Sequence, residues 1–194
     1  MTPRAALFAV LAWSAAVRAD PGEPLAFHEQ QSSSRLCIGG GVSRYLESSD
    51  LGLGGLWDVR LTFPAIRSWL RAEVAYVGTV HSANAGSAET AFTHSIETDG
   101  RLYFARSLGN FLVEPFVSGG FAYTFLVTST TTAPGSGYAL VPFGIGLTVI
   151  RDTLLLESRL TYRQGFHNHL ITRADGTHAS LTSWAATMAL GCAF

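Results

Sequence analysis

The chain has 194 residues, of which 47% are hydrophobic and only 14% are charged, and its formal net charge is −1. That length suits one domain with a sizeable core, but so few charges leave little to cover the surface of a water-soluble protein. The absence of any acidic or basic tract gives no reason to expect a nucleic-acid partner.

The N-terminal segment predicts export. Arg4 precedes an apolar run over residues 5–17, and small Ala19 follows it. This pattern is typical of a signal peptide, here residues 1–19, cleaved after Ala19. The run is too short to span a bilayer as a helix, and no later stretch reaches about eighteen uninterrupted apolar residues. We therefore expect either a soluble exported protein or a β-barrel in an outer membrane.

Residues 20–34 are rich in Pro, Gly, Ser and Gln, which predicts a flexible periplasmic lead. After it, eight segments alternate between apolar and polar residues and are separated by turn-forming residues, which predicts eight β-strands and no helix. The predicted strands are 36–46, 53–63, 69–80, 93–106, 111–127, 137–150, 153–165 and 180–194.

The connections between these strands alternate in length. Tight connections at 64–68, 107–110 and 151–152 alternate with mostly longer ones at 47–52, 81–92, 128–136 and 166–179, which are rich in Ser, Thr, Gly, Asn and His. Short turns at one end and long loops at the other are typical of an up-and-down barrel of the outer-membrane kind.

The faces of the strands separate a lipocalin-like barrel from a membrane barrel. In segment 53–63, Trp57 and Val59 lie on one face while Asp58 and Arg60 lie on the other, and the other segments repeat this division. An eight-stranded barrel is only just wide enough inside for side chains, so the large aromatic face is expected to point outward to lipid. Its aromatic members are Trp57, Phe63, Tyr76, Phe104, Phe121, Tyr123, Phe125, Phe143, Tyr162, Trp184 and Phe194.

The opposite face is expected to line the lumen with a structural network of charges. Its predicted members are Asp58, Arg60, Arg71, Glu73, Glu97, Asp99, Arg101, Glu114, Glu157 and Arg159, with Arg163 as a further arginine. An unpaired buried charge costs several kcal/mol, so these groups should pair and plug the lumen. The Gly-rich stretches at 39–42 and 118–121 are not followed by Gly-Lys-Ser/Thr, and we interpret them as making room for the arginines rather than as phosphate loops.

The stretches "GGGVSRYL" and "EPFVSGGFAYTF", the alternating loops and the terminal Phe resemble the outer membrane protein β-barrel family, in particular the small OmpA-like eight-stranded barrels. The resemblance covers residues 35–194. It implies an all-β, eight-stranded antiparallel up-and-down transmembrane barrel that contacts membrane lipids and lipopolysaccharide and meets the barrel-insertion machinery during assembly. It names no extracellular partner and no cofactor.

The last strand also carries part of this resemblance. The final strand, with its C-terminal aromatic residue Phe194, resembles the signal that the barrel-insertion machinery recognises in this family. Cys192 stands where a second aromatic is common. OmpA-like proteins that bind peptidoglycan continue into a further domain, so that activity is not implied for this chain. We therefore predict a structural or surface-interaction role through the loops, with no catalysis.

Two alternatives involve histidines. His167, His169 and His178, together with His81, lie in predicted loops where they could meet around a metal, although polar loops commonly contain His. His178 and Ser180 have the spacing for one face of a strand, which would suit a lipid A-modifying hydrolase, but Leu181 follows the Ser where the deacylase motif has Asn. A narrow channel is the third alternative.

The two cysteines, Cys37 and Cys192, would lie at the same height on the first and last strands, which are neighbours in a closed barrel. An exported protein favours disulfide formation. The alternation, however, places Cys37 inward and Cys192 outward. A β-bulge would restore the parity, so the sequence leaves the bridge open.

Overall fold

The computed structural model describes residues 33–46, 52–82, 90–128, 136–166 and 181–194. The predicted signal peptide 1–19 and residues 20–32 of the predicted lead lie outside them. The strands are β1 (Arg35–Tyr45), β2 (Gly54–Thr62), β3 (Leu70–Ser82), β4 (Thr90–Tyr103), β5 (Arg106–Leu108), β6 (Phe111–Thr128), β7 (Ser136–Arg151), β8 (Leu154–Phe166) and β9 (Ser183–Ala193). The described residues contain no helix long and apolar enough to cross a membrane.

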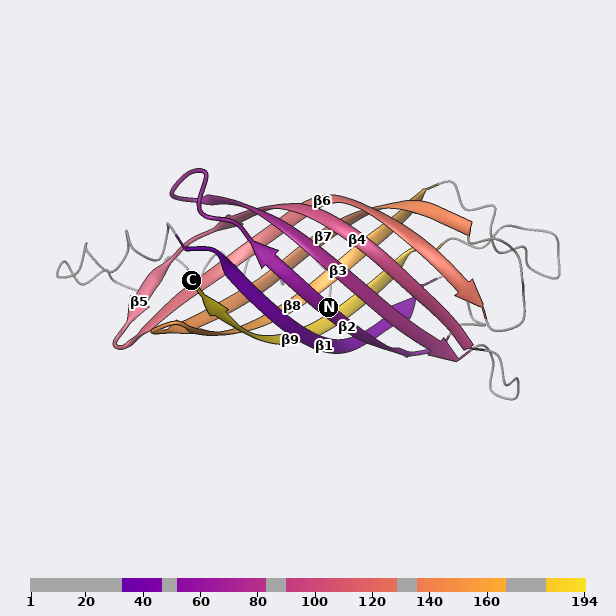
Figure 1. Ribbon diagram of the computed structural model, residues 1–194, viewed down its shortest axis with the longest axis horizontal. Helices are drawn as coiled ribbons and strands as arrows, with labels where there is room; N and C mark the ends of the chain where they lie inside the picture. The colour runs from indigo at the N-terminus through magenta and orange to yellow at the C-terminus, as the bar shows by residue number, and fades with distance from the viewer. Residues whose placement is uncertain (1–32, 47–51, 83–89, 129–135, 167–180) are drawn as a thin grey trace, which may run out of the picture. The chain divides into compact units, whose positions relative to one another are not determined.

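The strands form one antiparallel sheet that closes on itself. Each long strand pairs with the next in the chain, β1 pairs with β9, and β4 pairs with β6 to complete the ring. The strands run obliquely around the barrel (Figure 1). The prediction of an all-β, eight-stranded antiparallel up-and-down barrel is confirmed.

A short ninth strand, β5, lies beside β6 in line with β4. The last pair between β4 and β6 joins Tyr103 and Phe116, and the same register would next pair Phe104 with Pro115. The Phe104 amide does donate to the Pro115 carbonyl over 3.1 Å, but a proline has no amide hydrogen to return. The ladder is interrupted there and resumes in β5, so β4 ends at Tyr103, before the end of the predicted strand 93–106, and β5 extends into the predicted connection 107–110.

The connections define the two ends of the barrel. At the turn end, 63–69, 109–110 and 152–153 join β2 to β3, β5 to β6 and β7 to β8, and β1 begins and β9 ends there. Gly109 (φ 59°) and Asp152 (φ 55°) adopt the left-handed conformation, which Gly and Asp tolerate in tight turns. At the opposite end, the loop end, β1, β3, β6 and β8 finish.

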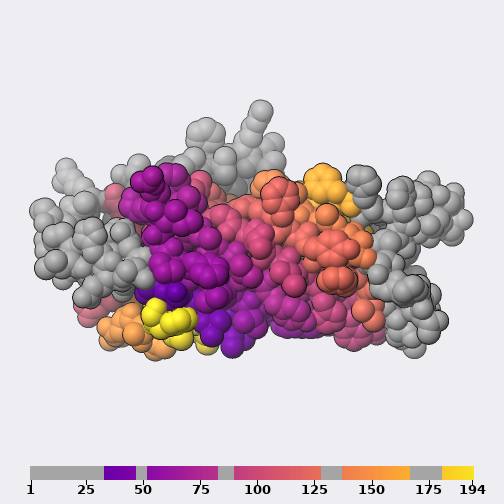
Figure 2. All heavy atoms as spheres, turned by 45° about the horizontal axis from the view of Figure 1, so that its top comes forward, coloured from indigo at the N-terminus to yellow at the C-terminus, as the bar shows by residue number. Residues whose placement is uncertain are grey.

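The two faces of the wall differ as the alternation predicted. Outward-facing side chains are mostly apolar and exposed, reaching 74% exposure at Phe121 and 70% at Leu190. Inward-facing side chains such as Asp58 and Glu73 are buried. On the face shown in Figure 2, the side chains of successive strands cover the wall without an opening. The lipocalin-like alternative, with charges outside, is therefore wrong.

The register of β1 and β9 decides whether Cys37 and Cys192 can form a disulfide. β1 and β9 pair without a bulge from Arg35 and Ala193 to Tyr45 and Ser183, which places Cys192 opposite Leu36 rather than opposite Cys37. Cys37 is buried in the lumen, Cys192 is exposed on the outer face, and both are free thiols. The continuous register rules out the bulge that a disulfide would have needed.

Candidate functional site

The lumen holds the charged side chains because inward positions recur every second residue. All ten residues predicted for the charge network are at most 7% exposed. Arg35 and Arg163 are buried beside them, so six carboxylates face six guanidinium groups. These twelve residues are called the lumen charges below.

Glu73 lies at the centre of the lumen charges. Its Oε1 accepts hydrogen bonds from Arg159 Nη1 at 2.7 Å and from Arg60 Nη1 at 3.2 Å. Its Oε2 accepts from Arg159 Nη2 at 2.9 Å, from Thr62 Oγ1 at 3.2 Å and from Arg101 Nη1 at 3.5 Å. One carboxylate from β3 therefore ties together arginines from β2, β4 and β8.

Glu157 is the second centre of the network. It accepts a hydrogen bond from Arg101 Nη1 at 2.6 Å and from Arg159 Nη2 at 2.8 Å, and the Thr148 hydroxyl donates to it over 3.1 Å. Phe116 lies beneath both arginines, with its ring centroid 3.6 Å from the Arg101 guanidinium carbon and 4.8 Å from that of Arg159. The ring face adds cation–π attraction to the ion pairs.

The remaining lumen charges form smaller groups. Arg60 pairs with Asp58 at 2.7 Å, Arg159 with Asp99 at 3.8 Å, and Arg163 with Glu97 at 2.7 Å. At the turn end, Arg35 and Glu114 form a bidentate pair whose Nη2–Oε1 bond is 2.8 Å. Arg71 donates to the Ser33 carbonyl at 3.3 Å and lies 4.9 Å over the Tyr103 ring.

Sequence reasoning missed two contributors to this network. Arg35 precedes the predicted first strand, yet it shares the parity of Cys37, so extending that strand by one residue would have placed it inside. Phe116 shares the parity of Glu114 and is 4% exposed, which the division into apolar and polar faces concealed. In both cases the alternation of inward and outward positions along the strand would have placed the residue in the lumen.

In each Gly-rich stretch one inward glycine, Gly39 or Gly120, lies against an aspartate rather than an arginine. A Cβ on Gly39 would approach Asp58 Oδ1 to 2.6 Å, and one on Gly120 would approach Asp99 Oδ1 to 2.5 Å and the Thr98 carbonyl to 1.9 Å. The expectation that these glycines make room for arginines is therefore corrected. They let two buried carboxylates lie close to the backbone of a neighbouring strand.

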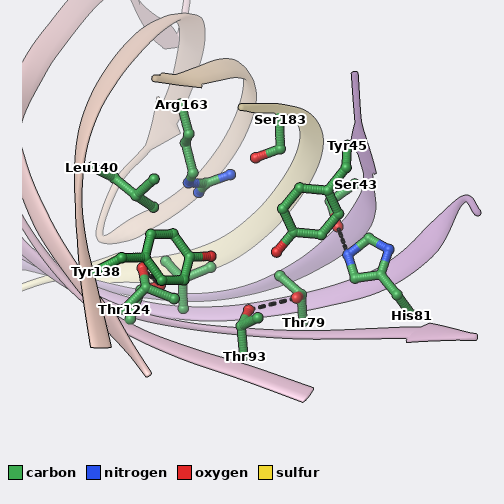
Figure 3. Close-up of a pocket in the computed structure, with 12 residues that line it drawn as sticks. Ser43, Tyr45, Thr79, His81, Thr93, Thr124, Tyr138, Leu140, Arg163 and Ser183 are labelled. Carbon is green, nitrogen blue, oxygen red and sulfur yellow. Dashed lines mark hydrogen bonds between the residues drawn. The ribbon is translucent and has the colours of Figure 1, made fainter. Parts of the chain in front are cut away.

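The loop-end half of the lumen has a different lining. A small cavity of about 20 Å³ is lined there mainly by hydroxyl side chains, with His81 and Arg163 among them (Figure 3). Thr79 hydrogen-bonds to Thr93 and Ser95 to Thr124, each at 2.6 Å. We refer to it as the loop-end cavity.

His81 is the one predicted loop histidine that the structure describes, and it lies in the barrel wall. Its Nε2 is 3.0 Å from Ser43 Oγ and its Nδ1 is 3.1 Å from the Gly52 carbonyl oxygen. Among the described residues no cluster of three or more His, Cys, Asp or Glu could hold a metal. His167, His169, His178 and Ser180 lie outside the described residues, so the metal and hydrolase hypotheses stay predictions.

Phe194, the predicted insertion signal, lies at the turn end. Its side chain is 69% exposed, and its backbone exchanges two hydrogen bonds with Ser34, both of 2.9 Å. The pairing of the first and last strands thus extends one residue into the predicted lead.

Solved structures of outer-membrane barrels are similar to this chain. The chain is similar to the N-terminal β-barrel domain of Pseudomonas aeruginosa OprF, with 14% identity, a TM-score of 0.56, and coverage of 84% of this chain and 98% of that one. It is also similar to neisserial surface protein A, with 11% identity, a TM-score of 0.58, and coverage of 83% and 97%. No protein-family model and no curated protein matches the sequence. At these identities the likeness concerns the fold, and it confirms the resemblance to small outer-membrane barrels at that level.

Proposed function

We propose that this protein is an integral outer-membrane barrel, exported by a cleaved signal peptide, whose loops meet partners outside the cell. The observation that carries the proposal is the inverted distribution of polarity. Charges are buried, whereas Phe121, Phe143, Leu154 and Leu190 are each more than half exposed on the outer face. A soluble protein rarely exposes contiguous apolar surface of this extent, and a lipid-facing band accounts for it.

The same proposal gives the lumen a structural role. The inside of an eight-stranded barrel is only wide enough for side chains, and the lumen charges occupy it with ion pairs that link opposite walls, such as Arg159 to Glu73. We infer that these pairs plug the lumen. A narrow channel is the alternative, because a charge network can rearrange.

The barrel ends suggest where partners bind. With the chain termini in the periplasm, the loop end faces the exterior. It carries the segments predicted as mostly longer loops, 47–52, 81–92, 128–136 and 166–179, of which 81–82, 90–92, 128, 136 and 166 belong to strands. Loops on a rigid scaffold commonly carry binding. Lipopolysaccharide and membrane lipids would surround the barrel, and Phe194 would serve the insertion machinery.

Fractionation combined with electrophoresis tests membrane integration. The protein should be recovered in the outer membrane, should need detergent or lipid to fold, and should change mobility when the sample is boiled. Recovery of a folded, monodisperse protein from buffer without detergent would contradict the proposal.

Labelling of intact cells tests the orientation separately. An epitope inserted at Gly135 should be labelled from outside, whereas the same epitope inserted at Asp152, in the turn between β7 and β8, should not. The reverse result would overturn the orientation and the loop-binding hypothesis with it, while leaving the membrane barrel intact.

A further inference from the structure

The loop-end cavity offers very little space. Its volume of about 20 Å³ gives room for one or two particles the size of water, since about 10–15 Å³ by this measure holds one water. A sugar or an acyl chain would not fit. None of the twelve residues that line it carries a carboxylate.

Arg163 directs unused donors into this space. Its side chain is 4% exposed, and its Nε donates to Glu97 Oε1 over 2.7 Å. Its Nη1 and Nη2 have no hydrogen-bond partner among the described residues. Figure 3 shows the guanidinium end of Arg163 pointing into the cavity. Glu97 occupies only the Nε position, so both terminal nitrogens remain to bind something else.

The hydroxyl pairs supply further donors. Between Thr79 and Thr93, and likewise between Ser95 and Thr124, one hydrogen lies between the two oxygens. Each pair therefore leaves one hydroxyl hydrogen and three lone pairs, and Thr124 also hydrogen-bonds to Tyr138. His81, held by Ser43 and Gly52, is neutral or cationic and adds no negative charge. The donors without a partner at the cavity are therefore the two terminal nitrogens of Arg163, and hydroxyl hydrogens of the wall can add to them.

We propose that the loop-end cavity binds a monatomic anion of the halide class, with Arg163 Nη1 and Nη2 as its charged ligands and wall hydroxyls as neutral ones. An anion accepts hydrogen bonds and donates none, so it matches the two guanidinium nitrogens of Arg163, which can only donate, and hydroxyls can turn their hydrogens toward it. The volume excludes bulky anions. The site is distinct from the ion pairs around Glu73 and does not depend on where the barrel resides.

Anomalous diffraction from wild-type crystals grown in bromide gives the direct test. A bromide peak is expected in the cavity, within hydrogen-bonding reach of the Arg163 Nη atoms. Bromide scatters anomalously near its absorption edge and water does not. Density without an anomalous peak would identify water alone and would overturn the proposal.

Thermal unfolding in detergent provides a second test. The protein is unfolded in chloride and in gluconate at equal ionic strength, and gluconate serves as the control because it is too large for the cavity. Chloride at ten times its dissociation constant should shift the folding equilibrium of the wild type by about elevenfold. Arg163→Gln should abolish the shift, whereas the control Arg151→Gln, at a side chain that is 63% exposed, should retain it. An equal shift in Arg163→Gln and the wild type would overturn the proposal. If Arg163→Gln fails to fold, the bromide result on the wild type still decides.

Discussion

Replacing Glu73 by Gln tests the energetic role of the lumen charges most directly. Glutamine keeps the size of the side chain and one acceptor oxygen but removes the negative charge. An amide in place of Oε2 would present donors to Arg159 Nη2, Arg101 Nη1 and Thr62 Oγ1, which all donate there now. The substitution therefore sets donor against donor at the two arginine contacts, whereas the Thr62 hydroxyl can turn and accept from the amide.

The expected cost follows from these contacts. A hydrogen bond to a charged group contributes about 1.5–3 kcal/mol, and removing one partner of a buried ion pair costs about 3–5 kcal/mol because it leaves an uncompensated charge. Glu73 is 1% exposed in its side chain, so solvent cannot compensate. We expect Glu73→Gln to lower the free energy of unfolding by about 3–5 kcal/mol.

Urea unfolding in lipid vesicles, followed by tryptophan fluorescence and by electrophoretic mobility, measures this cost. Asp152→Asn is the matched control because the Asp152 side chain is 89% exposed, and it should leave stability nearly unchanged. The double variant Glu73→Gln/Arg159→Gln should cost less than the sum of its two single changes, by about 0.5–3 kcal/mol. A Glu73→Gln protein within about 1 kcal/mol of the wild type would refute this reasoning.

Three further predictions concern the wall and the lumen. Val59→Arg and Leu102→Arg, on the outer face, should each cost about 2–4 kcal/mol in vesicle unfolding, whereas Thr132→Arg, in a predicted loop, should cost little; equal costs would contradict a lipid-facing wall. Gly120→Ala should cost about 1–3 kcal/mol, because its Cβ would meet the Thr98 carbonyl at 1.9 Å, while Gly100→Ala, whose nearest contact is 3.8 Å away, should be tolerated. Planar-bilayer recordings should show no stable, porin-sized conductance, and a large steady pore would count against a plugged lumen.

The sequence by itself determined the class of fold and the side of the wall on which each residue lies. Both follow from local rules, since side chains alternate with a period of two along a strand and turn-forming residues separate the strands. The parity of Asp58 and Arg60 against Trp57 and Val59 was therefore enough to place charges inside and aromatics outside, as the burial confirms.

Only the tertiary structure decided which charges meet. Arg159 and Glu73 are 86 residues apart in the chain, and their contact depends on the register of every strand pair between them and on closure of the ring. The register between β1 and β9 likewise decides that Cys192 lies opposite Leu36 rather than Cys37. The gap in the ladder at Pro115 arises because the register places this proline opposite Phe104. Alternation assigns a face to each residue, but the stagger between strands assigns its neighbours.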